Sequence, residues 1–377
     1  MGKEFSSMEN MAVDKLFSGI YKGRRVFITG HTGFKGSWLT FWLIQLGAIV
    51  KGYSLAPDTN PSHWDLLSLN IESVYADIRD REKLTEEICK FKPEIIFHLA
   101  AQPLVRVSYE NPFDTYEINI IGTLNLFEAC RQCRSVKAII NVTSDKCYEN
   151  REWIYGYREN DALGGFDPYS SSKACSEILT SSYRNSFFNI SEFGKTHNAL
   201  LASARAGNVI GGGDWAMDRL IPDIVKAVNK NVTVEIRNPD ATRPWQHVLE
   251  PLSGYLLLGK KLLEGNAEYA RAFNLGPDDE GIHTVRDITE ILKNKWDSIR
   301  IKYGSGNDPR HEASLLKLDC SLAHEMLQWF PVWDINEMLE HTVTWYRKYK
   351  ENSGISTADD LGSFIESARK KALSWTR

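Results

Sequence analysis

Residues 25–36 read RVFITGHTGFKG, and this stretch decides the fold. Val26, Phe27 and Ile28 form an apolar run with no polar alternation, which is typical of a strand buried on both faces. Glycines follow at three-residue spacing, and residues 37–43 then show the apolar spacing of a helix. A strand, a glycine turn and a helix start together form a diphosphate cradle, because free N–H groups and the positive end of the helix dipole meet the anion.

Each glycine of the turn has its own role in such a cradle. Gly30 permits the tight turn, Gly33 lets the backbone approach a pyrophosphate, and Gly36 lets the helix lie close to the strand. An ordinary strand-to-helix turn can carry the same glycines, so the triplet alone does not decide between the two. A P-loop needs Gly-Lys-Ser/Thr at the helix start, whereas Lys35 here precedes the glycine, and the P-loop is excluded.

Strands and helices alternate along the first half of the chain. Strand-like segments at 49–53, 74–80, 95–101 and 138–143 are separated by helical patterns, which predicts a parallel, doubly wound sheet. Ligands bind at the carboxyl ends of the strands in such a sheet, and that is where we expect the chemistry.

The end of the second strand bears on the choice of cofactor. NAD-binding sheets usually carry an acid there for the adenosine ribose, but this chain has Tyr53-Ser54-Leu55. No arginine replaces the acid to meet a ribose phosphate, although Lys35 in the glycine turn could do so. The sequence therefore favours NAD over NADP.

Two later strand ends offer further contacts. Asp77 and Asp80 follow the third strand, where they can reach an adenine amine or cap the helix at 81–91, and the sequence leaves both interpretations open. The fourth strand ends in small residues that let the backbone pass close to a dinucleotide. His98 on that strand is expected to be a core histidine rather than a ligand.

Candidate catalytic residues follow the fifth strand. Ser144-Asp145-Lys146 comes directly after it, and Tyr169 stands four residues before Lys173 on a predicted helix, so the last two share a face. The ammonium should lower the pKa of the phenol, which makes the tyrosine a base for a sugar hydroxyl. An isolated pair of this kind is more typical of a helix surface, but the glycine turn and the strand-end serine favour the catalytic interpretation.

TGHTGFKG, HLAAQ, the strand end at Ser144 and YSSSK together resemble the extended short-chain dehydrogenase/reductases that act on nucleotide sugars. The resemblance covers residues 22–350 and implies an α/β fold, a doubly wound parallel sheet (Rossmann) with a smaller mixed α/β C-terminal substrate domain. Ser144-Asp145-Lys146 is similar to the Thr-Asp-Glu triplet of the 4,6-dehydratases in this family. The lysine in third place and the segment RAGNVIGGGDW resemble the members that act on CDP-glucose.

The resemblance implies NAD as the cofactor and CDP-glucose as the substrate. Tyr169 takes the proton from the hydroxyl at sugar carbon 4 while hydride passes to NAD, water is lost across carbons 5 and 6, and the hydride returns to carbon 6. Ser144 binds the carbon 4 oxygen, Lys173 also holds the nicotinamide ribose, and Asp145 protonates the leaving hydroxyl. Lys146 occupies the place of a glutamate base, and it stays open whether it takes the proton or orients water or the enolate.

The expected binding residues divide between cofactor and substrate, and no metal is expected. Besides Tyr169 and Lys173, those expected at the dinucleotide are Gly30, Thr32, Gly33, Phe34, Lys35, Gly36, Asp77, Ile78, Leu99, Ala100 and Ala101. Those expected at the nucleotide sugar are Gln102, Asn208, Arg219, Arg243 and Arg310. Arginine suits the diphosphate because its planar guanidinium pairs with phosphate through two hydrogen bonds.

The chain is expected to divide into two parts and a tail. Residues 1–206 form the NAD-binding domain, to which 243–276 return, residues 207–242 and 277–350 form the nucleotide-sugar lobe, and 351–377 form a helical tail. Helices of the first domain are expected to pair across a two-fold axis, which gives a homodimer or homotetramer. They span 119–130 and 169–188.

Composition excludes other classes of partner. A formal net charge of −4 with 25% charged residues gives no basic surface for nucleic acid or an anionic membrane. No apolar run reaches membrane-spanning length and the first residues do not form a signal peptide, so we expect a cytoplasmic protein. Its six cysteines are then expected to be reduced.

Two alternatives carry less weight. Another nucleotide-sugar dehydratase or a 4-epimerase would share the fold, but by the resemblance the epimerases lack the pair at Asp145 and Lys146. A non-catalytic NAD-binding sensor would keep the glycine turn, but it need not retain Ser144, Tyr169 and Lys173.

Overall fold

The computed structural model describes residues 13–278, 281–304 and 315–377. Its centre is a seven-stranded sheet in the order β11-β6-β5-β4-β1-β2-β3, in which all neighbouring strands are parallel. The predicted doubly wound α/β class is therefore confirmed. The strands are β1 (Arg25–Thr29), β2 (Ile49–Ser54), β3 (Glu72–Tyr75), β4 (Ile95–His98), β5 (Ala138–Val142), β6 (Leu200–Ala206) and β11 (Ala272–Leu275).

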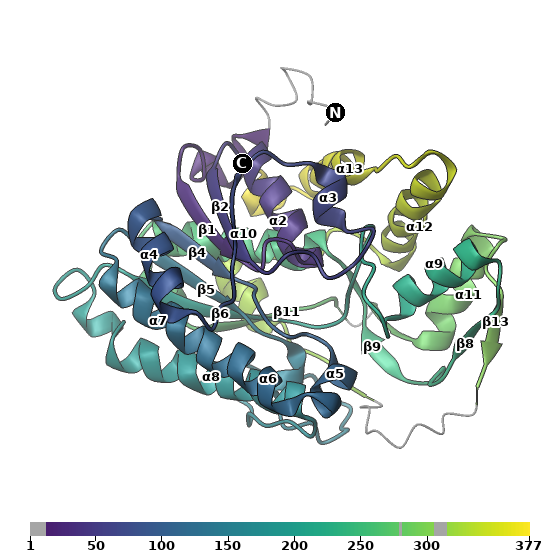
Figure 1. The fold of residues 1–377 in the computed structure, drawn as a ribbon, viewed down its shortest axis with the longest axis horizontal. Helices are drawn as coiled ribbons and strands as arrows, with labels where there is room; N and C mark the ends of the chain where they lie inside the picture. Colours follow the sequence, from purple (N-terminus) through teal and green to yellow (C-terminus); the bar gives the residue numbers. More distant parts are fainter. Residues whose placement is uncertain (1–12, 279–280, 305–314) are drawn as a thin grey trace.

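Helices cover both faces of this sheet (Figure 1). Alternate side chains of β1 divide between two hydrophobic cores, because Val26 and Ile28 join one core and Phe27 joins the other. The apolar run thus forms a strand buried on both faces, as predicted. On the first face lie α2 (Phe34–Gln45) and α10 (Leu249–Leu263), and on the second lie α4 (Arg81–Phe91), α7 (Gly122–Gln132) and α8 (Pro168–Ser186).

The glycine turn leads from β1 directly into α2. Gly30 has φ +75°, and a Cβ there would lie 2.7 Å from the backbone nitrogen of Ala100. A Cβ on Gly36 would lie 2.0 Å from the carbonyl oxygen of Gly30, so only glycine lets α2 start this close to the turn. Thr32 Oγ1 donates to the Leu55 carbonyl at 2.9 Å, which ties the turn to the end of β2.

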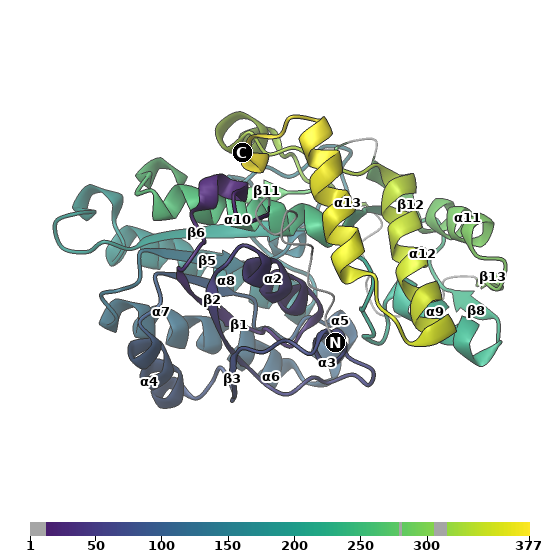
Figure 2. The same cartoon turned by 90° about the horizontal axis from the view of Figure 1, so that it is seen from above.

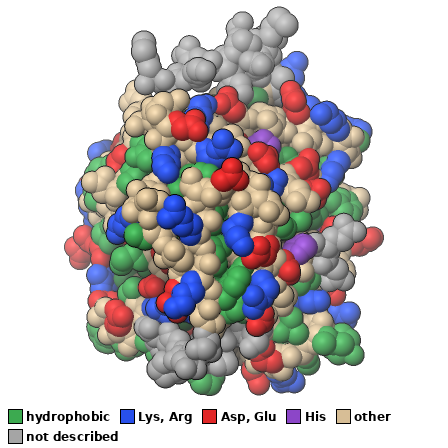
Figure 3. Space-filling model, turned by 90° about the vertical axis from the view of Figure 1, so that its right-hand side faces the viewer, with side chains coloured by type: hydrophobic (Ala, Val, Ile, Leu, Met, Phe, Trp, Pro, Cys, Tyr) green, Lys and Arg blue, Asp and Glu red, His purple; other side chains and the backbone are tan. Residues whose placement is uncertain are grey.

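A smaller mixed α/β lobe lies to one side of the sheet (Figure 1). Within it β8 pairs with β13 in parallel, and β9 pairs with β12 antiparallel. Acidic and basic side chains are interspersed on the face that this side of the molecule presents in Figure 3. The elements of the lobe are α9 (Leu220–Lys230), β8 (Val234–Ile236), β9 (Thr242–Pro244), β12 (Ile282–Thr284), α11 (Val285–Lys295) and β13 (Ile301–Tyr303).

Two C-terminal helices join the core on the same face as α2. They are α12 (Ile335–Asn352) and α13 (Thr357–Lys370), and Figure 2 shows α13 running between α2 and α12. The rings of Phe364 in α13 and Trp42 in α2 lie 6.0 Å apart, edge to face. The C-terminal segment is therefore packed against the helix that follows the glycine turn.

Three smaller expectations can be compared with the structure. Across the described ranges, no helix combines the length and the apolar character needed to cross a bilayer. All six cysteines fall in those ranges, and each is a free thiol. His98 is a core histidine, as predicted, because it is 2% exposed and its two ring nitrogens bond to the hydroxyls of Thr29 and Thr123 at 2.7 and 3.1 Å.

Candidate active site

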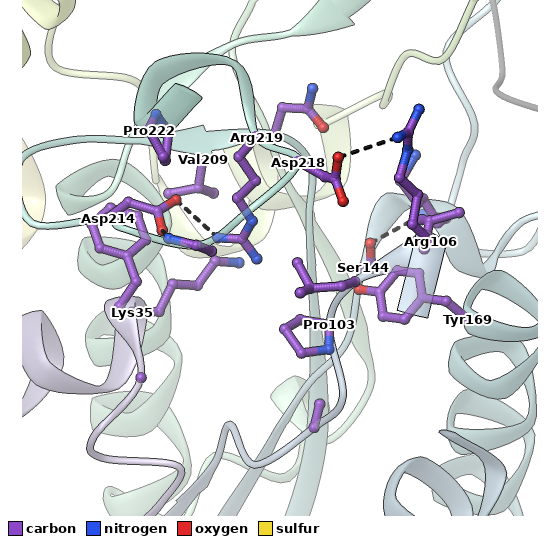
Figure 4. A pocket seen from close by; sticks show the side chains of 18 of the residues that line it. Lys35, Pro103, Arg106, Ser144, Tyr169, Val209, Asp214, Asp218, Arg219 and Pro222 are labelled. Atoms are coloured by element: carbon purple, nitrogen blue, oxygen red, sulfur yellow. Dashed lines mark hydrogen bonds and ion pairs between the residues drawn. The ribbon is translucent and has the colours of Figure 1, made fainter. Parts of the chain in front are cut away.

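A cavity of about 670 Å³ opens at the carboxyl ends of the strands, between the sheet and the lobe. The predicted catalytic residues all line it, and so do all the residues predicted at the dinucleotide and three of those predicted at the sugar, Asn208, Arg219 and Arg243. Sequence positions from Gly30 to Arg243 thus meet in one space. Figure 4 shows part of its wall.

One predicted substrate residue of the described part of the chain is not brought to this cavity. Gln102 is absent from its lining, because the side-chain amide donates to Leu104 O at 3.1 Å and Thr115 Oγ1 at 3.0 Å and accepts from the Leu104 N–H at 2.6 Å. Gln102 therefore holds its own loop together instead of facing a ligand. Arg310 lies outside the described residues.

The start of α2 has the properties of an anion site. Its N-cap is Gly33, which has no side chain to bond the first N–H groups of the helix. A Cβ on Gly33 would meet only the Gly30 carbonyl, at 3.5 Å, so the backbone is open to the cavity on this side. Free N–H groups and the helix dipole fit the diphosphate of a dinucleotide.

The two interpretations of the acids after β3 apply to different residues. Asp80 is the N-cap of α4, and its carboxylate accepts from the Lys83 N–H at 2.9 Å. Asp77 lines the cavity instead, next to Ile78. The guanidinium of Arg79 bonds Asp77 and lowers the pKa of that carboxyl. Only Asp77 is therefore placed to contact an adenine.

Tyr169 and Lys173 lie one turn apart near the start of α8, and each is 7% exposed. Burial raises the pKa of Tyr169 to about 12, although a hydrogen bond with Ser144 acts in the opposite direction. Burial also lowers the pKa of Lys173 to about 8. Sequence reasoning expected the Lys173 ammonium to lower the pKa of the Tyr169 phenol. The net shift is in the opposite direction, because removing the phenolate from water has a larger effect than its polar contacts.

An ion pair lies between α8 and β6. Glu177 follows Lys173 by one further turn and pairs with Arg205 of β6 at 2.7 Å, and the two side chains are 2% and 4% exposed. The same carboxylate accepts from the hydroxyls of Thr143 and Ser203. Its negative charge raises the pKa of Lys173 and so opposes the effect of burial.

The segment after β5 presents an unpaired carboxylate oxygen. Ser144 Oγ donates to Asp145 Oδ1 at 2.9 Å and also accepts from the Lys146 N–H at 3.2 Å. Asp145 Oδ2 is buried, and it has no hydrogen-bond partner among the residues that the structure describes. A Cβ at Gly207 would lie 2.9 Å from this oxygen, so the glycine leaves room beside the carboxylate. A buried acid with a free oxygen is suited to exchange a proton with a ligand.

Cations gather on the lobe side of the cavity. Arg219 Nη1 donates to the Asp214 carboxylate at 2.9 Å, and the negative charge of Asp214 raises the pKa of Arg219 (Figure 4). Lys35 extends from the glycine turn into the same region, and burial, followed by the charges of Arg219 and Lys173, lowers the pKa of Lys35 to about 7. The region is thus suited to an anionic group.

Sequence reasoning missed several residues of this site. Arg106 of α5 (Val105–Glu110) pairs with Asp218 at 3.2 Å, and Arg237 lies 3.5 Å from the same carboxylate, so Asp218 joins the sheet side to the lobe (Figure 4). His63 of α3 (His63–Leu67) also lines the cavity. These residues belong to no motif, and only the fold brings them together.

The protein-family model described as GDP-mannose 4,6 dehydratase matches residues 27–342. The chain belongs to this family. Its relatives include the CDP-glucose 4,6-dehydratase of Salmonella typhimurium, 52% identical over 339 residues, which cover 89% of this chain and 93% of that protein. The CDP-paratose 2-epimerase of Salmonella typhi is 28% identical over 71% of this chain and 83% of its own length.

Solved structures of other proteins share the fold. An epimerase from Methanothermobacter thermautotrophicus superposes with a TM-score of 0.76 at 23% identity, covering 92% of this chain and 97% of that one. The dTDP-glucose 4,6-dehydratase of Bacillus anthracis, solved in complex with NAD, gives a TM-score of 0.72 at 20% identity over 88% and 98% of the two chains. Both support the arrangement of sheet and lobe described above.

Proposed function

We propose that this member of the family is an NAD-dependent CDP-glucose 4,6-dehydratase, which forms CDP-4-dehydro-6-deoxyglucose and water. The observation that carries the proposal is the meeting of Tyr169 and Lys173 in one cavity with Asp145, whose Oδ2 has no hydrogen-bond partner among the described residues. A 4-epimerase needs the first two groups but has no water to expel, so it has no use for a buried acid. The identity of 52% to a CDP-glucose 4,6-dehydratase supports the choice of nucleotide.

In the proposed complex each residue has a separate task. The N–H groups at the start of α2 bind the cofactor diphosphate, and NAD supplies the acceptor for the hydride of sugar carbon 4 and its return to carbon 6. Tyr169 accepts the proton of the carbon 4 hydroxyl, which Ser144 orients. Asp145 donates the proton to the hydroxyl that leaves carbon 6. The proton lost from carbon 5 passes to Lys146, or to a water molecule that Lys146 orients at the cavity wall, and it returns to carbon 5 when the hydride returns to carbon 6.

The lobe side of the cavity is proposed to hold the sugar diphosphate. Arg219 and Arg243 both line the cavity, and their guanidinium groups suit phosphate oxygens. Asn208 stands at the end of the loop that follows β6 and lines the same wall. These three residues are the proposed substrate contacts.

A substrate panel tests the proposal. The protein is incubated with CDP-, UDP- and dTDP-glucose, and the products are identified by mass and by their absorbance in alkali, which reveals a keto sugar. We expect a 4-keto-6-deoxy sugar from CDP-glucose and much slower conversion of the other two. Recovery of the carbon 4 epimer from any of them, with no loss of water, would reject the dehydratase.

We also propose that two copies pair through α7 and α8. Ile178 of α8 is 55% exposed, Phe187 directly after α8 is 42% exposed, and Ile121 just before α7 is 45% exposed. This face therefore carries large apolar side chains in contact with water. Sedimentation of the wild-type chain and of Ile178→Asp tests the pairing. We expect a dimer or tetramer that dissociates in the variant, and a wild-type monomer would contradict it.

A further inference from the structure

Three buried side chains, distant in the sequence, form a hydrogen-bonded chain behind the start of α2. His63 Nδ1 lies 2.8 Å from Ser37 Oγ, and His63 Nε2 lies 2.9 Å from Thr357 Oγ1. Exposure is 0% at Ser37, 3% at His63 and 1% at Thr357, so no solvent competes for these bonds. These hydrogen bonds connect α2, α3 and α13.

Its two ends fix the direction of every hydrogen bond. Ser37 Oγ donates to the Phe34 carbonyl at 2.9 Å, because a carbonyl only accepts, and Trp345 Nε1 donates to Thr357 Oγ1 at 3.0 Å, because an indole only donates. Burial lowers the pKa of His63 to about 3, so its ring is neutral and carries one N–H. All four bonds are satisfied only if Nδ1–H donates to Ser37 and Nε2 accepts from the Thr357 hydroxyl.

The series of hydrogen bonds reaches the first turn of α2, which faces the cavity. Phe34 and Ser37 bracket the helix start whose backbone is proposed to bind the cofactor diphosphate, and His63 itself lines the cavity. His63 fixes the position of the Ser37 hydroxyl, which bonds the Phe34 carbonyl. It therefore also fixes the orientation of the backbone N–H groups between Phe34 and Ser37. The first helical turn is sensitive to such support because it has no capping side chain.

The rings of His63 and Trp345 also limit the position of the loop at Gly212 and Gly213, on the substrate side of the cavity. A Cβ on Gly213 would lie 2.5 Å from the His63 ring, and a Cβ on Gly212 would lie 2.0 Å from the Trp345 ring. The loop therefore lies directly against these rings and ends at Asp214, which holds Arg219. The cluster thus contacts both walls of the cavity without contacting the predicted catalytic residues.

We propose that Thr357, the first residue of α13, is a positioning residue for the dinucleotide, acting through His63 and Ser37 on the start of α2. The family match ends at residue 342, so α13 is an addition to the part that the family model describes. The inference rests on the proposed role of the α2 turn in cofactor binding. It adds that the C-terminal helix is part of that site.

The test measures NAD affinity by calorimetry on the full chain after bound nucleotide is removed. Thr357→Val keeps the shape of the side chain but removes the donor to His63, and we expect the Kd for NAD to rise about 3- to 10-fold, the usual value of one hydrogen bond. In Thr357→Ser the Kd for NAD should stay within about twofold of the wild-type value, because serine keeps the hydroxyl that donates to His63. With NAD saturating, kcat should stay unchanged, because Thr357 touches no reacting group.

Thr342→Val is the matched control. Thr342 is also fully buried, and its hydroxyl donates only to Met338 O at 2.8 Å within α12. We expect it to lower thermal stability as much as Thr357→Val does while leaving the Kd for NAD unchanged. Equal losses of NAD affinity in the two variants would mean general destabilisation and would overturn the proposal.

Two further measurements separate the possible failures. In ¹⁵N-histidine spectra, His63 of the wild type should carry its proton on Nδ1, and Thr357→Val should shift the ring toward the other tautomer; a proton on Nε2 in the wild type refutes the proposed direction. Gly33→Val should abolish NAD binding. If Gly33→Val abolishes NAD binding while Thr357→Val binds NAD normally, the positioning role of Thr357 is wrong, but the proposed binding of the cofactor at the start of α2 is supported. If Gly33→Val still binds NAD, the proposed cofactor turn itself fails.

Discussion

Glu177 and Arg205 form an ion pair of 2.7 Å that is almost wholly withdrawn from water beneath the cavity. The carboxylate lies one helical turn beyond Lys173 and raises its pKa, against the larger effect of burial. Three residues of α8 at four-residue spacing, Tyr169, Lys173 and Glu177, therefore run from the cavity into the core of the sheet. The charge state of the proposed catalytic lysine therefore depends on a pair that does not line the cavity.

Replacing Glu177 by glutamine should affect both stability and pH dependence. Arg205 would be left buried without its counter-charge, which lowers the free energy of unfolding by about 3–5 kcal/mol. The pKa of Lys173 should fall below its value of about 8, so the alkaline limit of activity moves to lower pH. Urea denaturation and a pH–rate profile measure the two effects. Glu149→Gln, which breaks an exposed pair with Arg151, should change neither.

Tyr169→Phe should lower turnover by at least about 10²- to 10⁴-fold, because the phenol is the proposed base, while NAD still binds. The control is Tyr183→Phe on the same helix, whose hydroxyl donates to Glu128 at 2.7 Å away from the cavity. It should retain activity. Substantial turnover by Tyr169→Phe would remove the phenol from the proposed mechanism.

Asp145→Asn should separate oxidation from water loss. The amide cannot donate the proton that the leaving hydroxyl needs, so reduced nicotinamide should accumulate during single turnover on CDP-glucose and the keto-deoxy sugar should form slowly. Stopped-flow absorbance follows the first event and mass analysis the second. Dehydration at the wild-type rate would exclude Asp145 as the acid.

His98 should make the protein sensitive to acid. Burial, with a smaller contribution from the charge of Lys173, lowers the pKa of His98 to about 3, whereas an unfolded histidine titrates near about 6.5. Between these values the unfolded state binds more protons, so stability is fully present above pH ~6.5 and is lost as the pH falls toward ~3. Melting temperatures against pH should decline in this window, and less steeply in His98→Gln. Parallel curves for the two proteins would contradict this.

The parts of the fold that sequence reasoning predicted are those whose signals are local. The order of β1, the glycine turn and α2 is encoded in residues 25–45, and the spacing of Tyr169 and Lys173 places both on one helix face. Gln102 was assigned to the substrate by resemblance, but its amide finds closer partners in Leu104 and Thr115. The direction of the Tyr169 pKa was wrong because burial depends on the whole fold.

The residues that sequence reasoning missed are joined by tertiary packing alone. Asp218 meets Arg106 across 112 positions of the chain, and no pattern near either residue indicates the other. His63 and Thr357 are ordinary residue types in segments without a motif. Arg310 falls outside the described residues, and its role and the division of the chain into domains stay predictions.

The bond between His63 and Thr357 joins positions 294 residues apart. During translation the ribosome releases the glycine turn and α3 long before α13, so a nascent chain exposes an unsupported cofactor turn until residue 357 has emerged. Tight binding of the dinucleotide would then begin only after residue 357 has emerged. Ribosome-bound chains that end before and after residue 357, each extended by a linker long enough to clear the exit tunnel, should differ in their retention on immobilised nucleotide.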